Sequence, residues 1–227
     1  MSKRTRIIVF DVNETLLDID VLNPFFQRTF GDARIMREWF AELILYSQAL
    51  TLSGNYIDFS KLVNSVLDMF AKAREVILKE NDVADFMKVM RNLPAHNDVL
   101  QALDMLRDAG FRMVSLTNST VESSKNLLDK AGLSCYFEKQ FSVDSVKKFK
   151  PSPDTYQMVA TDLGVALNQL RLVSAHTWDT MGASAAGCLS ALVTRPYNAA
   201  LGIGIQPDIV DVDLIKVARQ IIDIDVY

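Results

Sequence analysis

Near the start of the chain, a short unbroken run of apolar residues extends from Ile7 to Phe10 before the pattern changes. Four consecutive apolar positions rich in β-branched residues predict a strand that is buried on both faces. The run ends at Asp11, and polar side chains then occur at alternate positions. A carboxylate at the carboxyl end of a buried parallel strand lies where open α/β sheets bind their ligands. A strand that ends in a solvated turn is the alternative, and this stretch alone leaves both interpretations open.

Residues 17–91 follow the spacing of α-helices instead. Apolar side chains recur three or four positions apart, which places them on one face of a helix. These stripes cover 22–30, 35–50, 59–73 and 83–90. Core packing accounts for each stripe, so together they predict a small helical unit inserted after the first strand.

From Pro94 onwards, predicted helices and strands alternate. Ser119, with Glu122 three residues later, predicts a capping box at the start of one helix, and Ser152 before Pro153 predicts the start of another. We expect helices over 98–106, 119–132, 152–164 and 178–186, and strands over 111–116, 141–143, 170–174 and 189–193. Such alternation predicts an α/β fold with a doubly wound, mostly parallel, Rossmann-like sheet.

This order of elements predicts two domains. Residues 1–16 and 92–227 would form the Rossmann-like core, and residues 17–91 an α-helical cap. Because the cap follows the first strand directly, we expect it to lie over the carboxyl edge of the sheet. A cleft between a core and a lid is a favourable place to exclude water from chemistry.

Composition places the chain among globular proteins. It has 227 residues, of which 49% are hydrophobic and 23% charged, so it can bury a sizeable core. No apolar run approaches the roughly 18 residues of a membrane span, and no signal-peptide core precedes the first strand. The net charge of −4 and the lack of a long basic run disfavour nucleic-acid binding. Cys135 and Cys188 suggest small buried thiols in a reducing compartment. We therefore expect a soluble cytoplasmic protein without nucleic-acid or membrane partners, and a homodimer is left open.

Polar side chains recur at the ends of predicted strands or at the start of the following helix. They are Asp11, Thr117 with Asn118, Lys150, and His176 with Asp179. In a doubly wound sheet these ends lie together, although they are far apart in sequence. Asp11 would be a nucleophile or base, and Thr117 and Asn118 would hold an anion. Lys150 would keep Asp11 ionised by lowering its pKa, and Asp179 would orient Lys150 or help to activate water. Each residue alone could be a turn former, a cap or a solvated charge, but their occurrence at successive strand ends favours a shared site.

Four segments also resemble the motifs of the haloacid dehalogenase superfamily. These segments are Asp11–Thr15, Ser115–Ser119, Lys150–Pro151 and Val173–Asp179. The resemblance extends over essentially the whole chain, cap included, and is strongest to the type II branch, the L-2-haloacid dehalogenases. Two further features resemble that branch. They are the pair Trp178-Asp179 and Tyr156, which lies downstream of Pro151. Because the superfamily consists mostly of phosphatases, membership alone does not imply dehalogenation.

Two positions disfavour a phosphatase. Phosphatases of the superfamily carry a proton donor two residues after the nucleophile, where this chain has Asn13, which does not donate a proton usefully near neutral pH. They also bind Mg²⁺ through an aspartate near the place of Ser174 and Ala175, and alanine offers no side-chain oxygen to a hard cation. Cleavage of a carbon–halogen bond needs neither element, so we expect no metal and no cofactor.

The resemblance implies hydrolytic dehalogenation of short-chain 2-haloacids to 2-hydroxy acids. Asp11 would displace the halide and form an ester on its own side chain, and Lys150 and Asp179, with His176, would direct water to that ester. Thr15 and Ser174 match further catalytic positions. The substrate, a small anion, would be bound by Val12, Asn13, Phe40, Thr117, Asn118, Tyr156 and Trp178.

The chain departs from the type II pattern in its predicted halide site. Phe40 occupies the position of an arginine that holds the departing halide in the family, and Arg37, one helical turn earlier, is a less favoured replacement. Glu14 replaces a glycine and His176 an asparagine. A phosphatase or other hydrolase that uses the same nucleophile, and a drifted binding protein with little activity, therefore remain alternatives.

Overall fold

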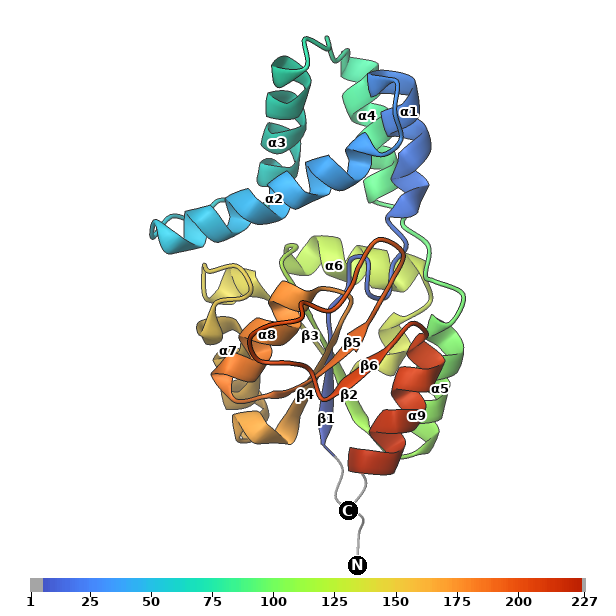
Figure 1. Ribbon diagram of the computed structural model, residues 1–227, viewed down its shortest axis with the longest axis vertical. Helices are drawn as coiled ribbons and strands as arrows, with labels where there is room; N and C mark the ends of the chain where they lie inside the picture. Colours follow the sequence, from blue (N-terminus) through green and yellow to red (C-terminus); the bar gives the residue numbers. More distant parts are fainter. Residues whose placement is uncertain (1–5, 226–227) are drawn as a thin grey trace, which may run out of the picture.

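A computed structural model describes residues 6–225, which contain one six-stranded sheet whose neighbouring strands are all parallel (Figure 1). Its strands are β1 (Ile7–Phe10), β2 (Arg112–Thr117), β3 (Lys139–Ser142), β4 (Leu170–Ser174), β5 (Leu189–Val193) and β6 (Ile209–Asp211). The spatial order β3-β2-β1-β4-β5-β6 places β1 at the centre, with the chain winding outwards on both sides. The predicted doubly wound α/β fold is therefore confirmed, and β6 is an element that we did not predict.

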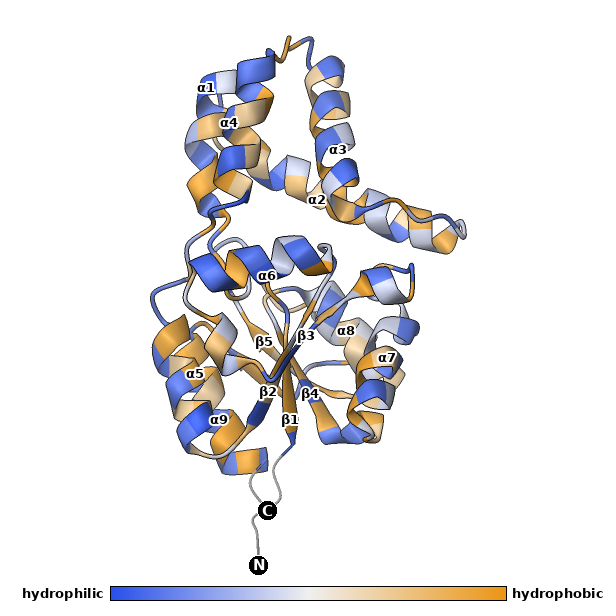
Figure 2. Cartoon of the chain, turned by 180° about the vertical axis from the view of Figure 1, so that it is seen from behind, coloured by the Kyte–Doolittle hydropathy of each residue, from blue (hydrophilic) through white to orange (hydrophobic). Residues whose placement is uncertain are grey.

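Helices cover both faces of this sheet. On one face α5 (Val99–Asp108) packs against α9 (Leu214–Asp225), and on the other α7 (Pro153–Leu163) packs against α8 (Thr177–Ala186). The remaining core helix, α6 (Val121–Lys130), follows β2. Figure 2 shows the strands at the centre as mostly hydrophobic, as expected for a parallel sheet that is covered on both faces.

The start of α6 differs from the predicted capping box. Its N-cap is Thr120, whose side chain accepts a hydrogen bond from the backbone N–H of Ser123. Ser119 does not cap the helix because it is buried and engaged elsewhere: the amide of Asn13 donates to its hydroxyl at 3.3 Å. The prediction was wrong by one residue, because the contact with Asn13 comes from a distant part of the chain.

Four further helices form a separate layer over the carboxyl edge of the sheet (Figure 1). They are α1 (Asn23–Phe30), α2 (Ile35–Leu52), α3 (Phe59–Ala73) and α4 (Glu80–Met90), and we refer to them as the helical cap. The cap has its own aromatic core, in which the ring centroids of Trp39 lie 5.5 Å from Phe26 and 5.2 Å from Phe86. Its helices thus bury their apolar faces against one another.

The chain enters and leaves the helical cap at adjacent points. Asp18 donates its backbone N–H to the carbonyl of Pro94 at 2.8 Å, and His96 donates to that of Leu16 at 3.0 Å. These paired crossings support our proposal that residues 17–91 form one domain and residues 1–16 and 92–227 the other. The ends of that proposed core, residues 1–5 and 226–227, lie outside the described residues.

A second set of contacts joins the helical cap to the segment that precedes α7. Tyr56 hydrogen bonds Asp144 and stacks on Phe149, with ring centroids 4.9 Å apart. The backbone N–H of Phe149 donates to the hydroxyl of Thr51, at the end of α2, at 2.9 Å. Because Lys150 is the next residue, these contacts position the cap relative to a predicted site residue.

Two expectations from composition can be compared with the structure. None of the helices within residues 6–225 combines the length and apolar character that a membrane crossing requires. Cys188 is buried as expected, whereas the prediction of a buried thiol was wrong for Cys135. Cys135 lies in a short 3₁₀ turn, Ser134–Tyr136, in which no residue is buried.

The aromatic core predicts a large effect for one truncation in the helical cap. Phe26 is fully buried among aromatic rings, so we expect Phe26→Ala to lower the free energy of unfolding by about 3–5 kcal/mol. Leu52→Ala, at a side chain that is 89% exposed, is the control and should change it by less than about 0.5 kcal/mol. Urea unfolding measures both, and equal effects would contradict the aromatic core.

Candidate active site

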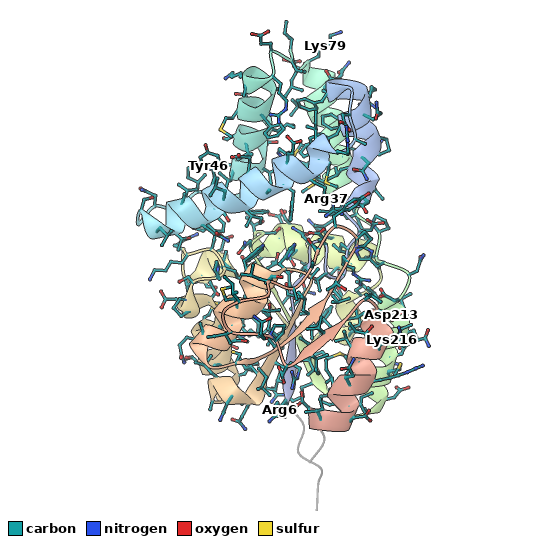
Figure 3. All side chains as sticks on the ribbon, in the orientation of Figure 1. Arg6, Arg37, Tyr46, Lys79, Asp213 and Lys216 are labelled. Carbon is teal, nitrogen blue, oxygen red and sulfur yellow. The ribbon has the colours of Figure 1, made fainter. Side chains whose placement is uncertain are left out.

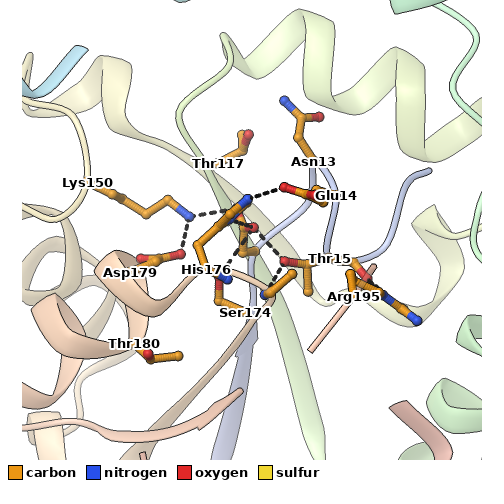
Figure 4. Close-up of polar contacts among 12 residues, drawn as sticks. Asn13, Glu14, Thr15, Thr117, Lys150, Ser174, His176, Asp179, Thr180 and Arg195 are labelled. Carbon is orange, nitrogen blue, oxygen red and sulfur yellow. Dashed lines mark hydrogen bonds and ion pairs between the residues drawn. The ribbon is translucent and has the colours of Figure 1, made fainter. Parts of the chain in front are cut away.

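The register of the sheet brings the predicted site residues to one edge. Phe10 at the end of β1 pairs with Ser115 of β2 and with Val173 of β4. Asp11, which follows β1, therefore lies at the carboxyl edge beneath the helical cap together with Thr117 and Ser174 (Figure 4), the last residues of β2 and β4.

The ammonium group of Lys150 lies between two carboxylates. Its Nζ is 2.7 Å from Asp11 Oδ1 and 2.7 Å from Asp179 Oδ2, and it also donates to the carbonyl of Leu116 at 3.2 Å. All three charged side chains are buried, with at most 6% exposed. Buried charges persist only when they are paired and hydrogen bonded, so the three groups form one interdependent unit.

The pKa shifts of Asp11 and Lys150 favour the ionised forms of both groups. Burial by itself would raise the pKa of Asp11, but the charge of Lys150 and the hydrogen bond and charge of His176 lower it well below its usual value. Burial would likewise lower the pKa of Lys150, but Asp11 and Asp179 raise it. Asp11 is therefore a carboxylate at neutral pH, as a nucleophile must be.

Other donors hold the second oxygen of Asp11. The hydroxyl of Thr15 lies 2.6 Å and that of Ser174 lies 3.4 Å from Asp11 Oδ2. Thr15 in turn accepts the backbone N–H of Ala175 at 2.8 Å, which ties the loop after β1 to the end of β4. These contacts fix the plane of the Asp11 carboxylate.

The partners of Lys150 are held in place as well. The hydroxyl of Tyr156 donates to Asp179 Oδ1 at 2.6 Å, and burial and the adjacent carboxylate raise the pKa of Tyr156 well above its usual value. Tyr156 therefore stays a donor. The side-chain oxygen of Asn118 accepts the backbone N–H of Lys150 at 3.0 Å, so Asn118 positions the lysine.

Whereas Lys150 contacts the Asp11 carboxylate at Oδ1, His176 contacts it at Oδ2. Its Nδ1 is 3.1 Å from Asp11 Oδ2, and its Nε2 is 2.8 Å from Glu14 Oε2. Trp178 stacks on the ring with centroids 4.9 Å apart, and Phe40 of the helical cap lies 5.7 Å away. The predicted residues Phe40, His176 and Trp178 thus form one group of rings beside the nucleophile.

The loop after β1 is the predicted substrate side of the site. Within residues 6–225, no hydrogen bond occupies the backbone N–H of Val12 or Asn13, so both donors are available to an anion. Thr117 lies nearby (Figure 4), although its hydroxyl accepts the N–H of Ser119 at 3.1 Å. A cleft of about 600 Å³ between the helical cap and α6 is lined by Asn13, Ser119 and Phe59 among others.

Arg37, the less favoured replacement for the halide-binding arginine, is paired with two carboxylates. It pairs with Glu14 and, at 2.6 Å, with Asp20, and it lies where α2 approaches the core (Figure 3). Both ends of its guanidinium are therefore engaged by carboxylates. Glu14, which we identified from the sequence only as a replacement for a glycine, links Arg37 to His176.

One positioning residue was missed because the predicted elements ended at residue 193. Arg195 is buried and donates to the carbonyl of Thr15 at 2.8 Å and to Asp98 Oδ2 at 2.7 Å. Its position in the sequence could have identified it, because Arg195 comes shortly after β5, as other polar site residues come at the ends of their strands.

The residues of this edge do not fit a Mg²⁺ site. Lys150 Nζ already binds one carboxylate oxygen of Asp11 and one of Asp179. Ala175 supplies no side-chain oxygen. Among residues 6–225, no three His, Cys, Asp or Glu side chains are grouped so as to hold a metal ion.

The chain matches a known protein family. The family model for haloacid dehalogenase-like hydrolases matches residues 5–187. The chain belongs to this family. The family predicted from the four motifs is thus confirmed.

Similar curated proteins and solved structures span nearly the whole chain. (S)-2-haloacid dehalogenase 1 of Pseudomonas sp. strain CBS-3 is 30% identical, over 84% of this chain and 85% of the relative. (S)-2-haloacid dehalogenase 2 of the same strain is 28% identical, over 88% and 89%. The structure of L-2-haloacid dehalogenase from Xanthobacter autotrophicus with chloropropionic acid covalently bound is 25% identical, with a TM-score of 0.86 over 96% of this chain and 98% of that one. The catalytic and substrate-binding roles of individual residues in this chain stay predictions.

The ion cluster leads to a pH-dependent prediction. Without Lys150, burial still raises the pKa of Asp11 and only the contact with His176 lowers it, so the folded variant should take up a proton on Asp11 more readily than the wild type as the pH falls. We expect Lys150→Met to lower the free energy of unfolding by about 3–5 kcal/mol at pH 7.5, and this loss should shrink as the pH falls towards 4.5.

Lys148→Met is the matched control for this prediction. Lys148 pairs with Asp154, and both side chains are nearly half exposed, so its loss should cost about 1 kcal/mol or less at either pH. Urea unfolding at the two pH values measures the difference. A constant deficit for Lys150→Met would show that the burial of Asp11 is not its cause.

Proposed function

We propose that the protein catalyses metal-independent hydrolytic dehalogenation of short-chain 2-haloacids to 2-hydroxy acids through an ester on Asp11. The observation that carries the proposal is the buried unit of Asp11, Lys150 and Asp179. It combines an ionised carboxylate with a second carboxylate that can accept a proton from water, under a helical cap. The dehalogenase names of relatives that cover most of the chain support this reaction.

In the first step, Asp11 attacks the carbon that bears the halogen. A bond forms between a carboxylate oxygen and carbon while the carbon–halogen bond breaks, and the halide leaves with the bonding electron pair. The backbone N–H groups of Val12 and Asn13, with Thr117, would bind the substrate carboxylate. Because a halide needs no proton when it leaves, Asn13 meets the needs of this step.

In the second step, water attacks the ester carbonyl of Asp11. Asp179 is 2.7 Å from Lys150 and 2.6 Å from the hydroxyl of Tyr156, which keeps its carboxylate oriented to accept a proton from that water. Single backside displacement in the first step implies inversion at the substrate carbon.

The cytoplasmic location stays a prediction from the sequence. The sequence left a homodimer open, and that question is unchanged.

Halide release tests the proposal directly. Wild-type protein should release halide from chloroacetate and from one enantiomer of 2-chloropropionate with EDTA present. Asp11→Asn should lower kcat by at least about 10⁴-fold, since loss of a nucleophile removes the covalent route. Asp154→Asn, at an exposed carboxylate outside the site, is the control and should keep the wild-type rate.

Two results would refute the proposal. One is unchanged halide release by Asp11→Asn. The other is Mg²⁺-dependent release of phosphate from p-nitrophenyl phosphate without halide release from any of the haloacids, which would identify a phosphatase.

A further inference from the structure

The two oxygens of the Asp11 carboxylate have different surroundings. Three donors converge on Oδ2: Thr15 Oγ1 at 2.6 Å, His176 Nδ1 at 3.1 Å and Ser174 Oγ at 3.4 Å. Among the described residues, Oδ1 has a single partner, Lys150 Nζ at 2.7 Å. Oδ1 is therefore the oxygen with capacity to attack a substrate, and Oδ2 is the oxygen that becomes the carbonyl of the ester.

The contacts of His176 specify its protonation state. Each ring nitrogen lies within hydrogen-bond distance of a carboxylate oxygen, Nδ1 of Asp11 and Nε2 of Glu14. A carboxylate only accepts hydrogen bonds, and a neutral imidazole donates from one nitrogen alone. Because Arg37 pairs with Glu14 and favours its carboxylate form, both contacts are satisfied together by an imidazolium, which carries a proton on each nitrogen.

Glu14 is built into the loop to make this contact. Its side chain is 2% exposed, and its backbone has φ of +64°, a left-handed conformation that residues other than glycine seldom adopt. The second oxygen of its carboxylate pairs with Arg37. The ring of Trp178 stacks on the imidazole, with the two ring planes 19° apart, and so restrains the orientation of the imidazole.

Several charged or titratable groups lie around His176 and the residues that contact it. They are Asp11 and Glu14 after β1, Asp20 and Arg37 at the helical cap, Lys150 before α7, Asp179 in α8, His96, whose Nε2 meets the carbonyl of Glu14, and Tyr197, whose ring faces Arg37. Within this set, the carboxylates of Asp11 and Glu14 are the groups in direct contact with His176.

We propose that Glu14 keeps His176 as an imidazolium, and that its Nδ1–H forms an oxyanion hole on Asp11 Oδ2 together with the hydroxyls of Thr15 and Ser174. Glu14 is then a positioning residue for hydrolysis of the ester, a step of the proposed function on which this inference rests. Preorganised donors around an oxygen that gains charge are among the largest contributions to catalysis.

The chemical step balances with water as the only co-reactant. Water adds to Cγ of the ester and gives a proton to Asp179, while the carbonyl electron pair moves onto Oδ2 and is held by the three donors. When that pair returns, the Cγ–Oδ1 bond breaks and Oδ1 leaves as the product hydroxyl. It takes a proton from Lys150, which recovers one from Asp179, and Asp11 returns its remaining proton to solvent.

This role affects one step only. During alkylation the carboxylate loses negative charge, so that step needs no oxyanion hole. During hydrolysis negative charge develops on Oδ2, so loss of a donor slows the release of product. A variant defective in the pair should therefore accumulate the covalent ester, which a purely structural defect would not produce.

Rapid-quench kinetics with chloroacetate separate the two steps. Glu14→Gln and His176→Asn should release one halide per protein in a first turnover at close to the wild-type rate. Their steady-state rates should then be about 10- to 1,000-fold lower, and intact mass spectrometry should show a carboxymethyl ester on the protein. Asp20→Asn, which removes the other carboxylate partner of Arg37, is the matched control and should behave as wild type.

A spectroscopic measurement tests the pair without relying on activity. The chain has two histidines, so ring ¹⁵N NMR of a His96→Gln background reports His176 alone. We expect two protonated ring nitrogens at pH 7.5, and one after Glu14→Gln.

The outcomes separate the two proposals. A wild-type protein that releases no halide overturns the proposed function. Halide release with equally slowed alkylation in Glu14→Gln, or a singly protonated His176 in the wild-type background, overturns the role of Glu14 and leaves the proposed function standing.

Discussion

The ammonium of Lys150, held between the carboxylates of Asp11 and Asp179, is the interaction on which the rest of the site depends. The free energy cost of burying one of these charges without its partners far exceeds the stabilisation that a surface ion pair provides. The fold therefore restrains the segment around the lysine closely. Asn118 accepts its backbone N–H, and Pro151 packs so tightly on α8 that a Cβ placed on Gly182 would lie 2.3 Å from that of the proline.

The parallel sheet explains how such an arrangement can be assembled from distant segments. The central strand β1 has β2 on one side and β4 on the other, so the residues that follow these strands share one edge. The helical cap then closes that edge through α2, which brings Phe40 and Arg37 to the site. Charges that are separated from water interact strongly, and this strengthens both the ion cluster and any preorganised donors.

The departures of this chain from the type II pattern are physically connected. Phe40 lies beside His176, His176 contacts Glu14, and Glu14 pairs with Arg37. The replacements look unfavourable when each is considered alone, because Phe40 removes the cation of an arginine and Glu14 adds a carboxylate in place of a glycine. Together they form a connected network in which the added carboxylate has two partners and the imidazole bridges it to the nucleophile.

Periodicity and local chemistry in the sequence determined the parallel α/β core, the helical stripes of the cap, and the set of polar residues at the ends of strands. These features are local, since a buried strand, an amphipathic helix and a strand-ending aspartate each have a signature within a few residues. Only the tertiary structure decided which partner each polar group has. Arg37 binds Glu14 rather than the substrate side, Ser119 meets Asn13 rather than capping α6, and Arg195 reaches back to Thr15. Those contacts join residues that are 23, 106 and 180 positions apart, and no pattern within a short stretch of sequence encodes them.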